Sequence, residues 1–288
     1  MPVRHQLVAA FVAVVWGINF IAVHASLEHY PPLLLLALRW LILAVPTLIF
    51  VPRPKVALRY LLIYALTLGT MEFVLLYWAM AIGMPAGLAS LVLQSSAPLT
   101  VILGAIFMRE RLSGVGVLGV VISALGLTVV GLDRGLSASL WPFVLTVLGG
   151  LGWALGNLAA RAARPDNAFH FTRWMTTIPP LPLLAMSWVY EGPDRISQAL
   201  STAPSALSAN LGLLFTSLIS SLFATTLWSW LMARHPASVV APWSMAVPVV
   251  GLATAWLILD ESVSWLAAAG CALVIVGVLS TSVRRRTT

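Results

Sequence analysis

Glu72 is the residue whose type and place most directly suggest chemistry, because it is the only carboxylate deep within a long apolar stretch. A charge at the centre of a bilayer costs about 2.5–3.5 kcal/mol on insertion scales, so it must face a partner or a cavity. Arg39 lies in the preceding apolar stretch at a similar depth, and we expect it to be structural. Glu72 fits three roles: an ion pair with Arg39, a site for an ammonium group, or a proton-coupling group. The second half has no matching carboxylate, so this role is not duplicated.

Pro98 and Pro248 also lie within apolar stretches, where they would open the backbone. Proline has no N–H, so the carbonyl four residues back loses its donor and the helix kinks. Those carbonyls belong to Gln94 and Ser244, which are polar, and Ser95 follows the first of them. We therefore predict two hinges beside polar binding groups. Proline is also common in membrane helices for packing alone.

Other polar and aromatic side chains could line the same cavity. Asn19 and Asn157 could donate hydrogen bonds to a carboxylate or to each other. Tyr77 and Trp243 present aromatic faces that suit an apolar side chain or a cation. Aromatic residues near helix ends are also common as interfacial anchors. The remaining candidates for substrate binding are Trp16 and Trp153.

No motif in the sequence indicates an enzyme or an ATP-driven motor. There is no G-x-x-x-x-G-K-[S/T] phosphate loop, no H-E-x-x-H and no G-x-S-x-G. The histidines lack metal-ligand spacing, and the single Cys271 permits no internal disulfide. The net charge of +7 comes from arginines at segment ends rather than from a basic stripe. We expect no cofactor, no metal and no nucleic-acid partner.

The elements that position these residues are predicted to be membrane-spanning helices. The chain has 288 residues, of which 60% are hydrophobic and 9% charged, whereas soluble domains carry roughly 25% charged residues. Lipid cannot satisfy an open backbone, so apolar runs of about 20 residues must be helical. The first run is longer than the apolar core of a signal peptide, and we expect it to be retained. The predicted helices are 7–27, 32–51, 58–81, 86–107, 114–132, 140–161, 168–190, 207–232, 237–259 and 265–283.

The second half of the chain repeats the first. Arg39 is followed by Pro46, and Arg173 is followed by Pro180 at the same spacing. Three further residues recur in the same order and spacing: Glu110, Gly119 and Gly126 as Glu261, Gly270 and Gly277. Glycines seven residues apart share one face of a helix, so we expect both glycine pairs to serve helix packing.

Each repeat carries five predicted spans, and we place the repeats at residues 1–134 and 135–288. An odd number of spans forces the two copies into the membrane in opposite orientations. The predicted fold class is an all-α integral membrane protein with ten transmembrane helices in two five-helix inverted-topology repeats. Inverted duplication is typical of secondary transporters, whose binding site lies where the copies meet.

The distribution of arginine orients the predicted bundle. With the N-terminus inside, the inner ends hold most of the basic residues, among them Arg4, Arg109, Arg234 and 284–286. By the positive-inside rule, both termini are expected in the cytoplasm. The predicted location is the plasma membrane, as a multi-pass protein, which in a bacterium is the inner membrane.

Several motifs resemble the drug/metabolite transporter superfamily, in particular its EamA-type ten-helix members. The matching pieces are Trp16-Gly17-x-Asn19, the Arg39 position, Pro98, and Glu110 with the glycine-rich helix after it, each with a copy in the second half. The Trp-rich, Met-containing composition looks most like the YddG-type amino-acid exporters of this superfamily. The resemblance implies export of amino acids or related metabolites from the cytoplasm.

The sequence therefore predicts an exporter with alternating access, favouring aromatic and other bulky neutral amino acids. Its partners are a small-molecule substrate and the lipid bilayer, and a monomer is expected to suffice. The main alternative is proton-coupled export of lipophilic cationic drugs through Glu72. A passive channel and a sensor that binds metabolites without moving them also stay open, as do the driving force and the oligomeric state.

Overall fold

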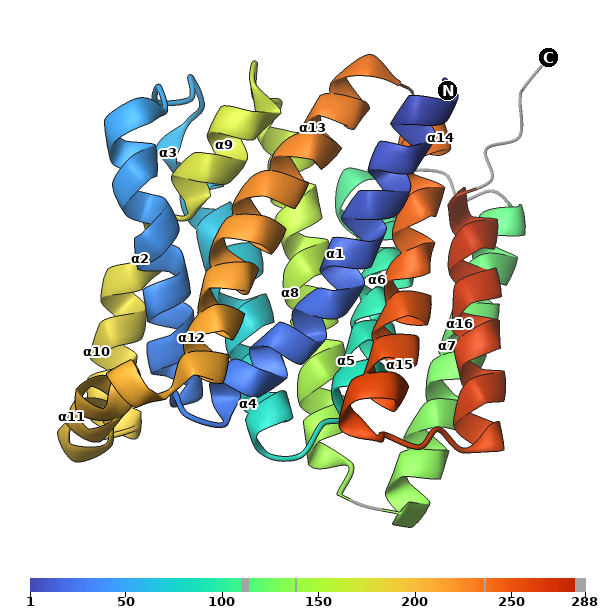
Figure 1. Ribbon diagram of the computed structural model, residues 1–288. Helices are drawn as coiled ribbons and strands as arrows, with labels where there is room; N and C mark the ends of the chain where they lie inside the picture. The colour runs from blue at the N-terminus through green and yellow to red at the C-terminus, as the bar shows by residue number, and fades with distance from the viewer. Residues whose placement is uncertain (110–113, 138, 236, 283–288) are drawn as a thin grey trace.

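The computed structural model describes residues 1–109, 114–137, 139–235 and 237–282. Every regular element within these ranges is a helix, and the helices form one bundle (Figure 1). Glu110, Pro236 and the arginines at 284–286 lie outside the described residues. The end of α16 lies at the same end of the bundle as the start of α1 (Figure 1).

The helices follow the predicted ranges closely. The first half contains α1 (Val3–Leu27), α2 (Pro32–Phe50), α3 (Leu58–Tyr64), η1 (Ala65–Glu72), α4 (Phe73–Ala81), α5 (Ala86–Val92), η2 (Leu93–Ser95), α6 (Ser96–Met108) and α7 (Gly114–Ser137). The second half contains α8 (Trp141–Ala163), α9 (Ala168–Met175), α10 (Pro180–Tyr190), α11 (Pro193–Thr202), η3 (Ala203–Ser205), α12 (Leu207–Leu214), η4 (Phe215–Ala224), α13 (Thr225–Arg234), α14 (Ala237–Val240), η5 (Ala241–Met245), α15 (Ala246–Leu259) and α16 (Trp265–Ser282).

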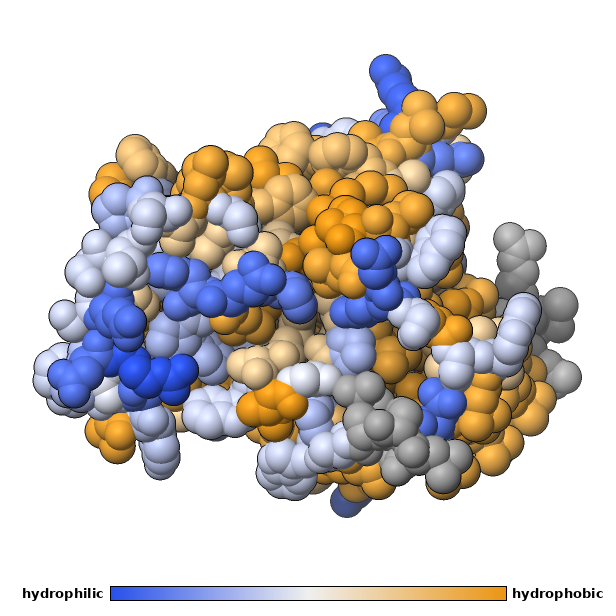
Figure 2. Space-filling view, turned by 60° about the horizontal axis from the view of Figure 1, so that its bottom comes forward, coloured by the Kyte–Doolittle hydropathy of each residue, from blue (hydrophilic) through white to orange (hydrophobic). Residues whose placement is uncertain are grey.

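Eight of the helical segments in the described residues are long and apolar enough to cross a membrane. Large apolar side chains are exposed along the sides of the bundle, for example Leu48, Phe107 and Trp256. Figure 2 looks toward the end that is at the bottom of Figure 1, and hydrophilic residues gather there while apolar residues cover much of the flank. This distribution belongs to a multi-pass membrane protein.

The prediction of one continuous helix over 168–190 is wrong. The chain leaves the helix after Met175 and resumes it at Pro180. Pro179 and Pro180 remove two consecutive backbone donors, and the hydroxyls of Thr176 and Thr177 bond back to the carbonyls three residues earlier, at 2.7 and 2.8 Å. The equivalent α2 contains a proline inside its helix and stays continuous, so the doubled proline accounts for the break.

The two predicted proline hinges lie directly after short 3₁₀ segments. Pro98 follows η2 near the start of α6, and Pro248 follows η5 near the start of α15. The carbonyls of Gln94 and Ser244 are not left without a donor, contrary to our expectation: the 3₁₀ turns direct the backbone N–H groups of the residues that follow them toward these oxygens. Tightening of the helix thus compensates for the missing proline donors.

Two other segments widen into π-helix, η1 in the first half and η4 in the second. They lie within the third and eighth predicted spans, which correspond to each other in the repeat. Isolated π-helical turns are rare and are frequent at functional sites. The 3₁₀ segments η2 and η5 and the π-helical segments η1 and η4 therefore recur at corresponding places in the sequence repeat, unlike the break after Met175.

The predicted glycine pairs lie where α7 packs against α16. A Cβ added to Gly126 would lie 2.7 Å from the Gly270 carbonyl oxygen, and one added to Gly277 would lie 2.7 Å from the Gly119 carbonyl oxygen. Neither position has room for a side chain, which agrees with a packing role. The two glycine-rich helices pair within one chain and lie side by side at one edge of the bundle (Figure 1).

Candidate functional site

Arg39 lies within α2 and is buried, with 4% of its surface exposed. Its Nη1 donates to Tyr77 Oη at 2.7 Å, while Nε and Nη2 donate to Ser221 Oγ at 3.2 and 2.8 Å. The guanidinium also lies 4.1 Å from the ring centre of Phe73 and 4.7 Å from that of Trp40. All of these partners are electrically neutral. A buried cation is thus held where α2, α4 and η4 meet, between the two halves of the chain.

The π-helical backbone around Ser221 orients its hydroxyl so that the oxygen can accept from Arg39. Its hydroxyl donates to the carbonyl oxygen of Thr216, five residues back, at 2.6 Å. Thr70, at the equivalent place in η1, donates to the carbonyl oxygen of Ala65 at 3.0 Å. Because the Ser221 proton is committed to Thr216, its oxygen is left to accept from Arg39.

Glu72 is the last residue of η1, and only 2% of its surface is exposed. Its Oε2 is buried and has no hydrogen-bond partner. Its backbone lies against α8, since a Cβ added to Gly152 would be 2.9 Å from the Glu72 nitrogen. A buried carboxylate with an unpaired oxygen carries a desolvation cost that a partner normally offsets.

The ion pair between Arg39 and Glu72, one of the three roles considered for Glu72, is not formed. No carboxylate oxygen of Glu72 lies within ion-pair distance of Arg39 in the described residues. Arg39 is drawn away by its hydrogen bonds to the neutral oxygens of Tyr77 and Ser221. Arg39 and Glu72 are therefore both buried without pairing to each other.

Arg173, the repeat equivalent of Arg39, is also buried, at 2% exposure. Its Nη2 donates to the Leu222 carbonyl at 3.1 Å, its guanidinium lies 5.2 Å from the ring centre of Phe169, and its Nε has no partner. Leu222 directly follows Ser221 in η4. Both equivalent arginines thus contact the same π-helical segment of the second half.

The two predicted asparagines are not bonded to each other. Asn157 donates to Thr100 Oγ1 at 3.2 Å, and the Oδ1 of Asn19 is buried without a partner. The buried hydroxyl of Ser95 likewise has no partner and lies against Gly150 of α8. These unsatisfied atoms are available to water or to a ligand.

The other predicted binding residues have contacts of their own. Trp16 donates to the Ser220 carbonyl at 3.4 Å, and its ring centre is 5.1 Å from that of Trp228. Ser244 donates to the carbonyl of Ala241 at 2.7 Å within its own turn. Gln94 is buried in η2, Trp153 is half-buried on α8, and Trp243 packs with a small apolar cluster against the start of α1. The structure therefore brings Tyr77 into contact with Arg39, and it places both Glu72 and Ser95 against residues 149–152 of α8.

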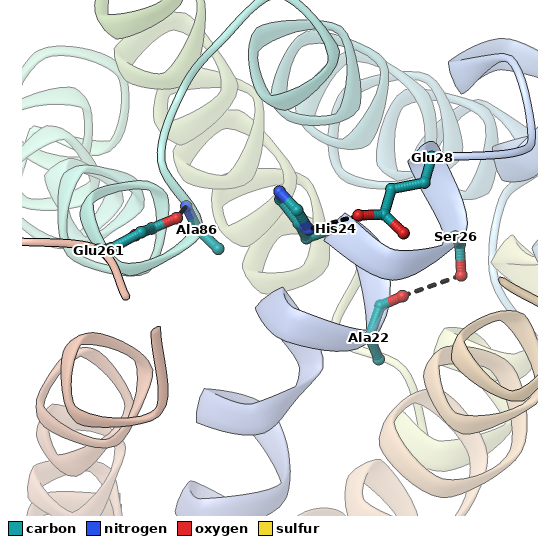
Figure 3. A network of polar contacts seen from close by, with 6 residues as sticks. All are labelled: Ala22, His24, Ser26, Glu28, Ala86 and Glu261. Carbon is teal, nitrogen blue, oxygen red and sulfur yellow. Dashed lines mark hydrogen bonds and ion pairs between the residues drawn. The ribbon is translucent and has the colours of Figure 1, made fainter. Parts of the chain in front are cut away.

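Two carboxylates of the second half cap the N-termini of first-half helices. Glu261 accepts from the backbone N–H groups of Ala86 and Gly87 at 2.8 and 3.0 Å, and Glu191 accepts from those of Leu33 and Leu34 at 2.7 and 3.0 Å. Figure 3 shows the Glu261 carboxylate beside Ala86, and the exposed His24–Glu28 pair nearby. Helix N-termini favour such anions. Both carboxylates link the second half to first-half helices.

Among the hollows at the surface of the described residues, one is bordered by Pro85, Leu88, Asp133 and Glu261, and another lies along α11. Neither of these is lined by a residue predicted to bind substrate. Of the predicted residues, Glu72, Tyr77, Gln94 and Ser95 are buried in the helix bundle.

Sequence reasoning missed three members of the polar centre around Arg39, namely Ser221, Phe73 and Trp40. Ser221 lies in a segment that also carries Thr216, Ser217 and Ser220, and this run of hydroxyl residues was a signal that could have been used. Phe73 looks like any other membrane-facing aromatic in the sequence, so its place over the Arg39 guanidinium could not have been inferred.

Comparisons with known proteins agree with this architecture. The sequence matches the EamA-like transporter family over residues 4–132 and 140–283. It is 38% identical to a protein of Salmonella typhimurium and 36% identical to one of Escherichia coli K12, in each case over 96% of this chain and 94% of the relative, and both are named "Probable amino-acid metabolite efflux pump". A crystal structure with 18% identity shares the fold, with a TM-score of 0.57 over 97% of this chain and 96% of that one. The protein therefore belongs to the EamA-like transporter family.

Proposed function

We propose that this protein is a secondary transporter that exports amino acids and related metabolites from the cytoplasm by alternating access. The observation that carries this proposal is the full-length similarity to two proteins named as amino-acid metabolite efflux pumps. The polar centre adds physical support, because an apolar bundle that buries Arg39 and Glu72 must recover their desolvation cost. We propose aromatic and other bulky neutral amino acids as the favoured substrates.

The proposed transport cycle uses the two halves as inverted five-helix repeats, residues 1–134 and 135–288, with ten spans in all. The two ranges that match the family, 4–132 and 140–283, support this division. Both termini would be cytoplasmic, in the inner membrane of a bacterium, and one chain would suffice. Rocking of one repeat against the other would expose the centre of the bundle to each side in turn.

The proposed binding residues divide by chemistry. Polar side chains would meet the ammonium and carboxylate groups of the substrate, and aromatic ones its side chain. The polar set is Asn19, Gln94, Ser95, Asn157 and Ser244, and the aromatic set is Trp16, Tyr77, Trp153 and Trp243. The unpaired buried oxygens of Asn19 and Ser95 favour this assignment, and Pro98 and Pro248 would serve as hinges.

Counterflow tests the proposal directly. Proteoliposomes preloaded with unlabelled phenylalanine should accumulate labelled phenylalanine, with a panel of amino acids and ethidium as competitors. Amino acids should block the uptake and ethidium should not. Absence of counterflow with every amino acid in the panel would refute the proposal.

A second candidate is proton-coupled export of lipophilic cationic drugs, and the unpaired Oε2 of Glu72 favours it. In that case ethidium should move under a pH gradient, and Glu72→Gln should abolish the response to the gradient. The matched control is Glu28→Gln, which changes an exposed carboxylate. A Glu72→Gln protein that still responds to the gradient would exclude this candidate.

A further inference from the structure

Arg39 carries an unbalanced charge. It donates three hydrogen bonds, all to neutral hydroxyl oxygens, whereas a guanidinium has five N–H donors in a planar fork. Within the described residues no carboxylate lies within ion-pair distance of it. The remaining two N–H groups and the full positive charge are thus available to an anion.

The surroundings hold this guanidinium in one orientation. Ser221 binds its Nε and Nη2 edge, Tyr77 binds Nη1, and the rings of Phe73 and Trp40 lie 4.1 and 4.7 Å from its central carbon. A guanidinium fixed in this way is suited to a carboxylate, which can accept from its remaining N–H groups. Little conformational entropy is then lost when the anion binds.

The Glu72 carboxylate lacks a hydrogen-bond donor, whereas Arg39 has N–H groups that lack an acceptor. Glu72 directly precedes Phe73, whose ring lies against the Arg39 guanidinium. The buried Glu72 Oε2 accepts no hydrogen bond, and Glu72 forms no ion pair with Arg39 in the described residues. An ammonium group is the partner that such an oxygen lacks.

We propose that Arg39 and Glu72 together form the binding site for the zwitterionic head of an α-amino acid. The substrate carboxylate binds the free N–H groups of Arg39, and its ammonium group binds Glu72. The inference rests on the proposed function, since it names the atoms that recognise the substrate. Arg39 then determines specificity instead of having only the structural role expected from the sequence.

The repeat provides a matched control. Arg173 occupies the equivalent position and is also buried, but it donates to a backbone carbonyl, and no carboxylate lies within ion-pair distance of it in the described residues. Removal of either arginine takes a buried cation out of the bundle. Only removal of Arg39 should change which chemical group on the substrate is recognised.

The test is competition against labelled phenylalanine in the counterflow assay, with phenylalanine, phenylalaninamide and 3-phenylpropionate as unlabelled competitors. The amide lacks the carboxylate and the propionate lacks the ammonium. Arg39→Gln should weaken competition by phenylalanine by about tenfold or more, as expected for loss of charged hydrogen bonds, and leave competition by the amide unchanged. Glu72→Gln should remove the preference for phenylalanine over 3-phenylpropionate. Arg173→Gln should leave both preferences as in the wild type.

The outcomes separate the two proposals. No counterflow of any amino acid by the wild type would refute the transport function itself. Counterflow by the wild type, with the same ratio of acid to amide in Arg39→Gln, would overturn the role of Arg39. If Arg39→Gln does not insert stably, Arg39→Lys and Tyr77→Phe keep the charge while they disturb its position. A partial loss of the preference for phenylalanine over its amide would then support the proposal, and an unchanged preference would overturn it.

Discussion

Arg39 and Arg173 occupy the same place in the two halves of the chain, yet their surroundings differ. Arg39 lies on a continuous helix and is held by side-chain hydroxyls and two aromatic rings. Arg173 lies on a short helix that ends before Pro179 and Pro180, and its Nε has no partner. A buried cation is thus present in each half of the chain, but only Arg39 is held by side-chain hydroxyls. Symmetry in sequence does not require symmetry in function.

Both arginines also contact the second half of the chain. Both reach η4 in the second half, Arg39 through Ser221 and Arg173 through the Leu222 carbonyl. The equivalent η1 has Thr70 in place of Ser221, with the same bond to the carbonyl five residues back. The two π-helical segments share this backbone feature, and η4 is the one that accepts hydrogen bonds from the two arginines.

The largest effect on transport is expected for Ser221→Ala, and Thr70→Ala is the matched comparison in the other half. Ser221→Ala removes two hydrogen bonds from a buried guanidinium, each worth about 1.5–3 kcal/mol. Counterflow should fall by about tenfold or more. Thr70→Ala removes a bond to a backbone carbonyl only and should reduce it by less. Equal effects of the two substitutions would show that the π-helical segments are functionally equivalent.

A large effect on stability is expected at the contact between α7 and α16. Gly126→Ala places a methyl group 2.7 Å from the Gly270 carbonyl oxygen, whereas a methyl group on Gly114 meets nothing within 4 Å. Overpacking costs about 1–3 kcal/mol. The midpoint of thermal unfolding in detergent should fall for Gly126→Ala and stay near that of the wild type for Gly114→Ala. A stable Gly126→Ala protein would contradict the packing role.

Pro98→Ala and Pro248→Ala test whether the two hinges are equivalent. Each substitution restores a backbone donor next to a 3₁₀ segment, which should straighten the helix. The rate of counterflow should fall several-fold for both, with little change in the amount of protein in the membrane. Parallel loss of transport and of protein would leave the prolines with a folding role alone.

The smallest effects, on thermal stability, are expected for the carboxylates Glu261 and Glu28. Glu261→Gln weakens two charge-assisted hydrogen bonds at the N-terminus of α5 and should cost about 0.5–2 kcal/mol. Glu28→Gln alters an exposed pair at 3.9 Å and should cost less than about 1 kcal/mol. Thermal unfolding of the two variants checks the order. If Glu28→Gln proves the more damaging, the capping role of Glu261 is wrong.

Much of the fold could be predicted because the bilayer leaves few choices. Apolar runs must be helical, and the helices found follow the predicted ranges, apart from the break between Met175 and Pro180 and from α11, which lies in a stretch where no helix was predicted. That break was missed because a single proline, such as Pro46, is tolerated within a helix, whereas two adjacent prolines remove consecutive donors. The carbonyls of Gln94 and Ser244 were expected to be free, but the 3₁₀ turns supply donors to them.

The candidate site was predicted only in part. Glu72 and Arg39 were identified because a charge within an apolar run is costly wherever it lies. Their relation was not settled, because a hydrophobic pattern gives the depth of a side chain but not the direction in which it points. Tyr77 was placed near the site from its aromatic character, and its hydrogen bond to Arg39 was not foreseen.

The sequence by itself determined that this chain is a helical membrane protein with a repeated pattern and with two charges that must be accommodated inside it. These conclusions follow from transfer free energies and from spacing along one chain, which need no partner residue. The tertiary structure alone decided that Arg39 binds Tyr77 and Ser221 rather than Glu72, because that choice depends on where α2, α4 and η4 meet. The Glu72 carboxylate is consequently left with an unpaired oxygen in the interior.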